Sequence, residues 1–521
     1  MFRHPIARML LSAVVLALPF ALAVAQLAVR HQATLADLSP APYPNGTTSD
    51  SLYYWHQAAS FAVQGMRSGY YTVGEQPAPA PFSPFYTWGM FVPAFYGMLG
   101  AVFGWQLNSI PIINLVLLTL ALALYIAVMR PNIPQLLLLG GFIITSNALH
   151  IQYAASMTTV LHLALAVTLA SFASWRFEDD PERQDARDAK RKPASLLSVL
   201  FLLCLLLVST LLLPTWGTLF VFVGALLLRG HWTRVAIGVL VGGGVFAALT
   251  LLVQSTGAPF ANPLTEMLNA ARSSPADGMA RLLDNIRLNV SYTLQGSLVE
   301  VVTRLQTLLV ALIMLAGWVL PRLTGRWFAG WTRMELAFHA LNLGSVYLIA
   351  LLFYEQTAGR DYRLFAPRLL LSALVLVGMK RYRMAVVLLA TMGLVLPNAL
   401  YDGGAWAEAH ISRDGHAFFY ETRAALNTVA SYDEGNAPAR WCNSVLMSFV
   451  YVSEMPAVPL AFSPGIGLSW GIEALQPETV QARYLLLTDA DAARFPAWQL
   501  GERVSLPGGS LYINNANLCL P

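Results

Sequence analysis

Long apolar segments recur along the chain, separated by shorter polar stretches. Many of these segments approach the length of about 20 residues that a helix needs to cross about 30 Å of hydrocarbon. The pattern therefore predicts a polytopic helical membrane protein. We predict eleven membrane spans, at residues 9–29, 108–129, 134–150, 157–175, 195–213, 215–228, 234–253, 298–320, 334–353, 364–379 and 383–400.

The composition supports this interpretation. Of the 521 residues, 56% are hydrophobic and only 12% are charged. In soluble domains about a quarter of all residues are usually charged. In a membrane protein a net charge of +4 reflects topology, so it gives no reason to expect nucleic-acid binding.

The positions of Arg and Lys predict the orientation of the spans, because short cytosolic loops are enriched in these residues. With the N-terminus in the cytosol, the inner loops hold Arg130, Arg176, the run "RQDARDAKRK" (183–192) and "KRYR" (380–383). The outer connections at 147–156 and 213–217 hold no Lys or Arg. An odd number of spans then places the C-terminus outside the cytosol.

The first apolar segment ends in "ALAVAQ", which looks like a signal-peptidase site, so cleavage there is an alternative. A retained first helix is favoured because many further spans follow. Arg greatly outnumbers Lys, which suggests a GC-rich bacterial genome. The predicted location is therefore a bacterial inner membrane, with the C-terminal domain in the periplasm.

Two domains are expected, a transmembrane domain at 1–400 and a soluble extracytoplasmic domain at 401–521, which is too polar to span a membrane. Within the second domain, "ETRAALNTVASY" (421–432) predicts an amphipathic helix. Strands are predicted at "NSVLMSFVYV" (443–452), "ARYLLLTDA" (482–490) and "SLYINN" (510–515). The fold class is thus a polytopic α-helical membrane protein with a small C-terminal α/β domain.

Two of the three cysteines, Cys442 and Cys519, lie in the predicted outer domain. Thiols on the oxidising side of the membrane can persist as a disulfide. We expect Cys442 and Cys519 to form one, and two unpaired buried thiols are the alternative.

The first outer loop, residues 30–107, contains a candidate catalytic acid. Asp50 precedes a segment in which Leu52, Trp55, Ala59, Ala62 and Met66 share one helical face. An amphipathic helix rich in aromatic residues is expected to lie on the membrane surface. The Pro-rich "EQPAPAPFSPFYTW" (75–88) should then run extended, and a second surface segment, "GMFVPAFYGMLGAVFGW" (89–105), leads to the next span.

Asp50 also has a purely structural explanation. Ser49 or Asp50 can serve as the N-cap of the helix that follows, because Ser and Asp side chains accept hydrogen bonds from its free N–H groups. The two roles are compatible, since a cap holds the carboxylate in a fixed place.

A second outer loop, "YEQTAGRDYRLFAPR" (354–368), gathers Arg360, Arg363 and Arg368 on the outer side, against the positive-inside trend. A guanidinium can bind a phosphate through two parallel hydrogen bonds. These cations therefore suit a lipid-linked phosphate, and simple pairing with lipid headgroups is the alternative.

Several other kinds of site lack their motifs. The chain has no Gly-rich phosphate loop followed by Lys, no paired-His metal motif and no nucleophile elbow. His162, inside a predicted span, is interpreted as a packing residue.

The order of these features resembles the GT-C-type glycosyltransferases, integral membrane enzymes that take a sugar from a polyprenyl-phosphate carrier. The stretch "SDSLYYWHQAASFAVQG" (49–65) is similar to their first-loop pattern of an acid, Tyr residues and an Ala-rich helix. The stretch "RDYRLFAP" (360–367) is similar to their Arg-Tyr-x-x-x-Pro segment near the lipid phosphate.

The resemblance implies sugar transfer to a lipid or glycan acceptor at the outer face of the membrane, with Asp50 as general base. It also implies substrate contacts by a set of residues from both loops: Tyr53, Tyr54, Glu75, Arg360, Tyr362, Arg363 and Arg368. Many members carry a second acid close to the first, whereas here the next acid after Asp50 is Glu75. No cofactor is therefore implied, and a divalent metal stays open.

Three other functions compete with this one. A transporter is expected to show paired repeats and charges inside its spans, and neither is visible. A glycan polymerase or ligase is expected to carry its large outer loop late in the chain, whereas here the longest loop comes first. A catalytically inactive relative remains compatible with a solitary acid.

Overall fold

The computed structural model describes most of the chain. The described residues are 5–38, 50–67, 71–73, 89–146, 149–150, 157–178, 196–227, 232–256, 263–325, 327–353, 362–401, 413–433, 440–455 and 457–517.

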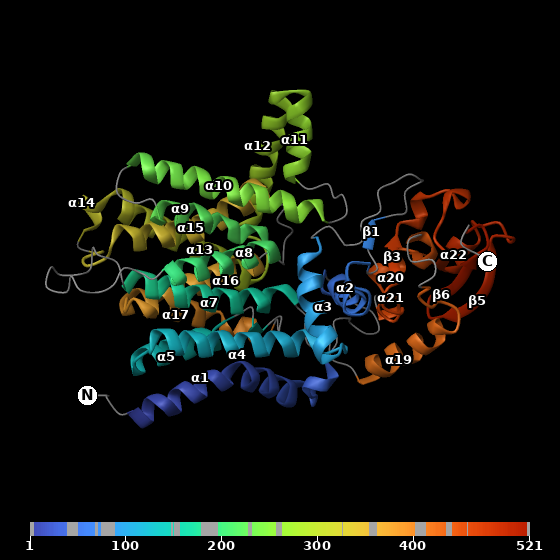
Figure 1. Ribbon diagram of the computed structural model, residues 1–521, viewed down its shortest axis with the longest axis horizontal. Helices are drawn as coiled ribbons and strands as arrows, with labels where there is room; N and C mark the ends of the chain where they lie inside the picture. Colours follow the sequence, from blue (N-terminus) through green and yellow to red (C-terminus); the bar gives the residue numbers. More distant parts are fainter. Residues whose placement is uncertain are drawn as a thin grey trace.

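Helices form a bundle that takes up most of the protein (Figure 1). Each of the eleven predicted spans coincides with a helix, or with most of one, so the predicted fold class is confirmed. The bundle helices are α1 (Pro5–Gln26), α4 (Ser109–Met129), α5 (Ile133–Ile144), α7 (Met157–Glu178), α8 (Leu196–Leu212), α9 (Leu219–Leu227), α10 (Trp232–Ser255), α13 (Leu298–Val319), α15 (Arg333–Leu352), α16 (Tyr362–Gly378) and α17 (Tyr382–Leu394).

Length and composition single out five helices of the described chain as able to cross a membrane. They begin at Pro5, Ser109, Thr233, Leu298 and Arg333. The other predicted spans correspond to apolar helices that are shorter by this measure. The predicted number of eleven spans therefore stays a prediction.

Helix α16 lies at the centre of the bundle. From Leu369 to Val377 its side chains are at most 2% exposed. A helix that is apolar all round is stable only where neighbours cover every face, and α7, α13 and α15 pack against this one. By contrast, α10 is mostly uncovered and has apolar side chains pointing outward along its length, as a lipid-facing helix would.

Close packing of α9 and α10 explains several glycines of the sequence. A Cβ atom added at Gly238 would lie 2.2 Å from the carbonyl oxygen of Gly224, and one at Gly242 would lie 2.3 Å from that of Phe220. Such distances exclude any larger residue, as at helix crossings in membranes generally. Gly243 and Gly244 face open space, so only Gly242 of this triplet serves the packing.

Five strands of the C-terminal part and one earlier strand form a six-stranded sheet in the order β1-β3-β2-β4-β6-β5. The first four strands in that order are parallel, and β6 and β5 add antiparallel pairs at one edge. The strands are β1 (Tyr71–Val73), β2 (Ser444–Met447), β3 (Gly467–Trp470), β4 (Tyr484–Leu487), β5 (Leu500–Leu506) and β6 (Gly509–Asn514).

Strand β1 comes from the first outer loop and not from the C-terminal segment. It pairs with β3 in the register Tyr71 to Leu468 and Val73 to Trp470. The sheet therefore joins two segments that are nearly 400 residues apart in sequence. The predicted boundary at 400 stays a prediction, but the two predicted domains share this sheet.

The predicted C-terminal elements are recovered with shifted ends. Helix α19 (Arg413–Asn427) covers most of the predicted helix, and β4 and β6 lie within or across the predicted strands. The stretch predicted as one strand at 443–452 divides into β2 and the short helix α20 (Val450–Ser453). Two further short α-helices of this part are α21 (Ala457–Leu460) and α22 (Asp489–Ala492).

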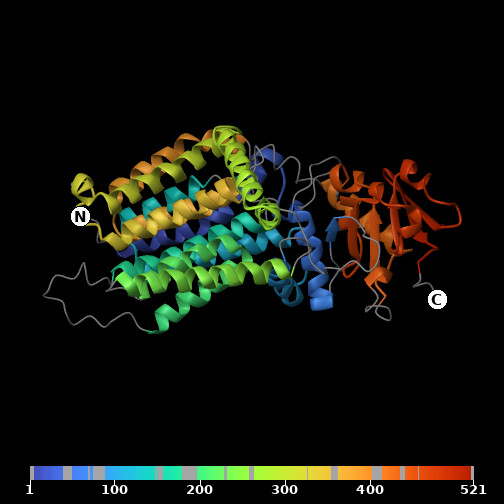
Figure 2. The same ribbon diagram turned by 90° about the horizontal axis from the view of Figure 1, so that it is seen from above.

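The bundle and the sheet lie at opposite ends of the long axis (Figure 1). Between them are α2 (Asp50–Gln64) and α3 (Phe91–Phe103), which run across the direction of the long helices. The first described residues of α1 lie at the end of the bundle far from the sheet (Figure 2). A hairpin of α11 (Pro263–Ser273) and α12 (Pro275–Tyr292) projects sideways from the bundle, and the short α14 (Pro321–Thr324) lies near its far end.

Candidate active site between the bundle and the sheet

Helix α2 begins at Asp50, where the sequence predicts a helix with an acid at its start. Seven consecutive residues, from Tyr54 to Ser60, are buried. Because successive helical residues point in different directions, a continuous buried run means that protein surrounds the helix on every side. This differs from the expected surface helix, which would keep one face in lipid. The side chains of Asp50 and Tyr53 lie outside the described part of the structure.

Helix α3 covers one side of α2, and a glycine allows the two backbones to approach closely. A Cβ atom added at Gly97 would lie 2.7 Å from Cβ of Phe61 and 3.0 Å from the carbonyl oxygen of Ala58. The indole Nε1 of Trp55 donates to the carbonyl oxygen of Gln106 at 3.1 Å. These contacts fix α2 to the segment that leads into the bundle.

The C-terminal domain covers another side of α2. The ring of Phe419, on α19, meets Trp55 edge-on with 5.9 Å between ring centroids. The backbone N–H of Gly465 donates to Oγ of Ser60 at 2.9 Å in a buried position. Arg423 stacks on Phe419 at 4.5 Å and donates through Nε to the carbonyl oxygen of Ala461 at 3.2 Å. The helix that starts with Asp50 is thus held from both directions.

Two buried polar side chains, His56 and Gln57, lie within this enclosed run. Burial, together with the positive charge of Arg423, lowers the pKa of His56 to about 3, so His56 is neutral at physiological pH. Burial likewise lowers the pKa of Arg423. Neither Oε1 nor Nε2 of Gln57 has a hydrogen-bond partner among the described residues. A buried amide normally forms hydrogen bonds. The burial of a polar side chain such as Gln57 in α2 is therefore not explained by packing against apolar neighbours.

Of the other predicted substrate residues in the first loop, Tyr54 is buried in this interface at 5% exposure. Glu75 and the extended segment around it lie outside the described residues. In the second loop, Tyr362 and Arg363 form the start of α16, although nothing is described of their side chains, and Arg360 lies outside the described residues.

The start of α16 and helix α2 lie at the same end of the bundle. The projecting hairpin lies at the end of the bundle nearest the sheet. The carbonyl oxygen of Leu352, at the end of α15, accepts a hydrogen bond from Asn285 of this hairpin, so α15 ends there too. Only a short segment connects Leu352 to Tyr362, so α16 begins at that end as well. The structure therefore brings the two predicted site segments to one end of the bundle.

Arg368 is separate from Arg363 at the start of the helix, because it lies about 7.5 Å further along α16. It is 1% exposed. Its guanidinium stacks on Trp216 at 4.1 Å and donates to Oδ1 of Asn342 at 3.0 Å, to Oγ1 of Thr218 at 3.4 Å and to the carbonyl oxygen of Thr215. Among the described residues no carboxylate pairs with it. The guanidinium of Arg368 is therefore bound by neutral groups of the protein itself.

Apart from Asn342 of α15, the partners of Arg368 belong to η5 (Pro214–Thr218), the tight reversal between α8 and α9. The sequence marks this turn through "LPTWG" but gives no sign that a distant arginine supports it. The indole Nε1 of Trp216 donates to Nδ1 of His162 at 3.2 Å, which gives that histidine a packing role. Irregular backbone inside a membrane protein needs such internal partners, since lipid supplies none.

Two further predictions concern metals and disulfides. Within the described residues no group of three His, Cys, Asp or Glu side chains could hold a metal ion. Cys442 is buried in η6 (Arg440–Asn443), whereas Cys519 lies outside the described residues, so their disulfide stays a prediction.

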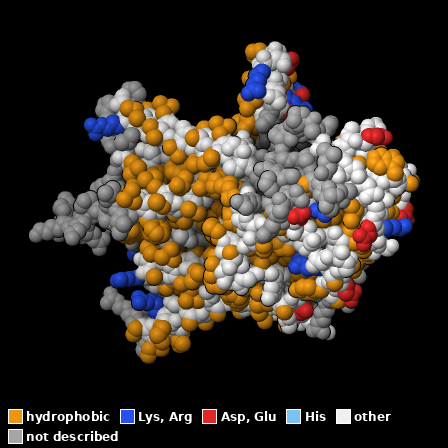
Figure 3. Space-filling model, turned by 45° about the vertical axis from the view of Figure 1, so that its right-hand side comes forward, with side chains coloured by type: hydrophobic (Ala, Val, Ile, Leu, Met, Phe, Trp, Pro, Cys, Tyr) orange, Lys and Arg blue, Asp and Glu red, His pale blue; other side chains and the backbone are white. Residues whose placement is uncertain are grey.

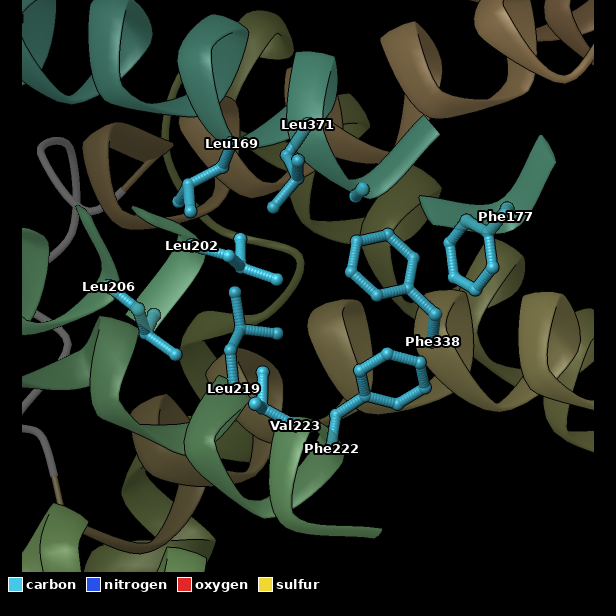
Figure 4. A pocket seen from close by; sticks show the side chains of 10 residues that line it. Leu169, Phe177, Leu202, Leu206, Leu219, Phe222, Val223, Phe338 and Leu371 are labelled. Carbon is cyan, nitrogen blue, oxygen red and sulfur yellow. The ribbon is translucent and has the colours of Figure 1, made fainter. Parts of the chain in front are cut away.

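A small apolar pocket lies inside the bundle, among α7, α8, α9, α15 and α16 (Figure 4). Its volume is about 30 Å³, and Leu169, Phe222 and Phe338 are among the side chains that point into it. Its lining offers no charged or polar side chain, so it can take up at most a small apolar group.

Comparisons with known proteins give structural neighbours but no sequence relatives. No family model and no curated protein matches the sequence. Similar solved structures are ArnT from Cupriavidus metallidurans in the apo state, with 11% identity over 98% of both chains and a TM-score of 0.40, and the same protein bound to undecaprenyl phosphate, with 11% identity over 98% of this chain and 99% of that one and a TM-score of 0.41.

A third neighbour is the Archaeoglobus fulgidus oligosaccharyltransferase in complex with Zn and sulfate, with 10% identity over 95% of this chain and 73% of that chain and a TM-score of 0.47. At these identities and scores, the likeness concerns the general course of the chain. It does not extend to substrates or to the roles of residues.

Proposed function

We propose that this protein is a membrane glycosyltransferase that moves a sugar from a polyprenyl-phosphate carrier to a hydroxyl of a lipid or glycan acceptor at the outer face of a bacterial inner membrane. The main support is the position of α2. The helix that begins with Asp50 is held between the bundle and the sheet domain, at the end of the bundle where α16 begins with Tyr362 and Arg363.

The proposed reaction follows from the chemistry of the two segments. The acceptor oxygen attacks the anomeric carbon of the sugar, and the bond from that carbon to the phosphate oxygen breaks. The carboxylate of Asp50 takes the proton of the attacking hydroxyl as general base. The leaving lipid phosphate keeps the bonding electron pair, and the cations Arg360 and Arg363 stabilise its charge.

This location suits the two substrates. The lipid tail of the donor stays among the bundle helices, while the acceptor can approach from the water side. Figure 3 shows apolar side chains over the bundle and acidic and basic side chains over the sheet domain. A site between these two surfaces can bring both substrates together.

The substitution Asp50→Asn tests the base. Asn is about as good an N-cap as Asp, so the change should cost at most about a few tenths of a kcal/mol of helix stability. A neutral amide cannot take a proton, so sugar transfer from a polyprenyl-phosphate sugar should fall by about 10²–10⁴-fold. Normal membrane yield with near-normal transfer would limit Asp50 to a capping role and leave the proposed reaction without its base.

The arginines of the second loop can be separated in the same assay. Arg363→Gln should raise the KM for the polyprenyl-phosphate sugar while leaving membrane yield unchanged, because Arg363 is proposed to bind the phosphate. Arg368→Gln should instead destabilise the bundle by about 1–3 kcal/mol, because it leaves buried acceptors such as the Thr215 carbonyl without their donor. A stable Arg368→Gln protein with a raised KM would move the phosphate site to Arg368.

A further inference from the structure

The hairpin of α11 and α12, here called the arm, has no assigned role. It connects α10 to α13 and extends sideways beyond the bundle (Figures 1 and 3). Its helices run across the direction of the long helices, at the end of the bundle nearest the sheet. If the long helices cross the membrane, the arm lies parallel to the outer membrane surface.

The root of the arm is fixed by polar contacts. Nδ2 of Asn285 donates to the carbonyl oxygen of Leu352, and Nδ2 of Asn289 to that of Leu351, both at 2.9 Å. These carbonyls lie at the end of α15, where helical partners are missing. Arg304 of α13 donates to the carbonyl oxygens of Tyr292 and Gln295, where the arm returns to the bundle. The direction of the arm is therefore set by the fold.

The two helices of the arm also hold each other. Gly278 packs so closely that an added Cβ atom would lie 2.5 Å from Cβ of Ala271. Arg281 of α12 forms an ion pair with Glu266 of α11. The arm is thus a stiff unit rather than a loop that happens to be helical.

One side of α12 is apolar and uncovered. Met279, Leu283, Ile286 and Val290 follow each other at intervals of four, three and four residues, which keeps them on one helical face. Met279, Leu283 and Val290 are 56%, 47% and 56% exposed. We call these four residues the stripe. The charged residues Arg281 and Asp284 lie on the other side of the helix.

Three features indicate that lipid covers the stripe. First, the arm follows directly on α10, whose exposed apolar side chains face outward over most of its length. Second, three arginines balance three acids between 263 and 295, so the arm has no net charge with which to attract a charged partner. Third, four side chains on one helix make a narrow surface, whereas a stable protein pair buries about 800 Å² on each partner.

We propose that the arm is a membrane-interface anchor, with the stripe buried at the boundary between headgroups and acyl chains of the outer leaflet and the charged side in water. Helices with such an apolar face lie in the plane of the interface. The anchor holds the outer end of the bundle, and the sheet domain beside it, at a fixed height over the membrane. It binds through apolar contact, so anionic lipids are not required.

The experiment measures how deep the two sides of α12 lie. Met279→Cys and Val290→Cys report on the stripe, and Asp284→Cys, on the charged side of the same helix, is the matched control. Each is made in the full chain carrying Cys204→Ser, labelled with a nitroxide and placed in nanodiscs of phosphatidylcholine with and without phosphatidylglycerol. The signal of the labelled Cys204→Ser protein is subtracted.

The nitroxides at 279 and 290 should collide several-fold more often with oxygen, and less often with a water-soluble nickel chelate, than the nitroxide at 284. Phosphatidylglycerol should not change this ratio. Equal access of the nickel chelate to all three positions would overturn the proposal. Protection of 279 and 290 from both reagents would also overturn it, because it would place a second copy or another protein on the stripe.

Discussion

Helices α2 and α12 make an instructive pair. Both are amphipathic, both run across the long helices at the same end of the bundle, and they have 15 and 18 residues. Protein surrounds α2 from Tyr54 to Ser60, whereas the stripe of α12 remains open. An amphipathic pattern therefore shows that one face of a helix is buried away from water, but it does not show whether protein or lipid buries it.

The polar residues of the two helices distinguish these cases. In α2, Ser60 is buried and accepts a hydrogen bond from the sheet domain. His56 and Gln57 are buried as well, and lipid could not take up such groups without cost. In α12 the polar residues Asn285 and Asn289 donate hydrogen bonds at the root of the arm, and the stripe itself is wholly apolar. The position of the polar groups therefore indicates better than the apolar face whether protein or lipid covers a helix.

The largest expected effect comes from removing the aromatic contact between α2 and the sheet domain. Trp55→Ala deletes a side chain that is 2% exposed and contacts Phe419 and Gln106. It should lower the free energy of unfolding in mixed micelles by about 3–5 kcal/mol. Val63→Ala is the control on the same helix, since Val63 is 66% exposed. Equal stability of both variants would mean that α2 is not enclosed.

A comparable effect is expected from pH. The pKa of His56 in the folded protein is about 3, below its ordinary value of 6.5, so the unfolded chain binds this proton first as pH falls. The stability that His56 contributes is present above pH 6.5 and is lost as pH falls towards 3, at about 1.4 kcal/mol per pH unit.

His56→Gln should remove this share of the pH dependence. The measurement is the difference between the pH profiles of unfolding for the unchanged protein and for His56→Gln, in which the titration of other groups cancels. Parallel profiles between pH 6.5 and 4 would show that His56 is not buried in the neutral form.

The smallest effect is expected on the arm. Met279→Ala changes a side chain that is 56% exposed. In mixed micelles the free energy of unfolding should change by less than about 0.5 kcal/mol, as for most surface substitutions. A loss as large as that of Trp55→Ala would end the contrast between the two helices, because the stripe would then belong to a packed core.

Much of the fold could be predicted from local patterns. Apolar segments near span length marked the helices of the bundle, and Asp50 correctly marked the start of α2. Exceptions occurred where a segment depends on distant partners. The stretch at 443–452 has strand-like residues throughout, yet it turns into α20 after Met447. Strand β1 is three residues long and pairs with β3, so no local pattern could reveal it.

The candidate site was less accessible to this reasoning. Arg360, Arg363 and Arg368 share one short stretch of sequence and were grouped on that basis. The helical geometry of α16 moves Arg368 into the bundle, where Trp216 and Asn342 surround it. Charge and spacing cannot show such a difference, because the groups that take up the guanidinium come from other helices.

The sequence by itself determined which segments are apolar, how long they are and where Arg and Lys interrupt them, because hydrophobic transfer and local hydrogen bonding depend on each residue and its near neighbours. Only the tertiary structure decided what covers each face. The enclosure of Trp55 by Phe419, the hydrogen bond from Gly465 to Ser60 and the burial of Arg368 against η5 all join residues more than 100 positions apart. Contacts of this kind depend on how whole elements pack, and that packing is set by the shapes and polar groups of all of them together.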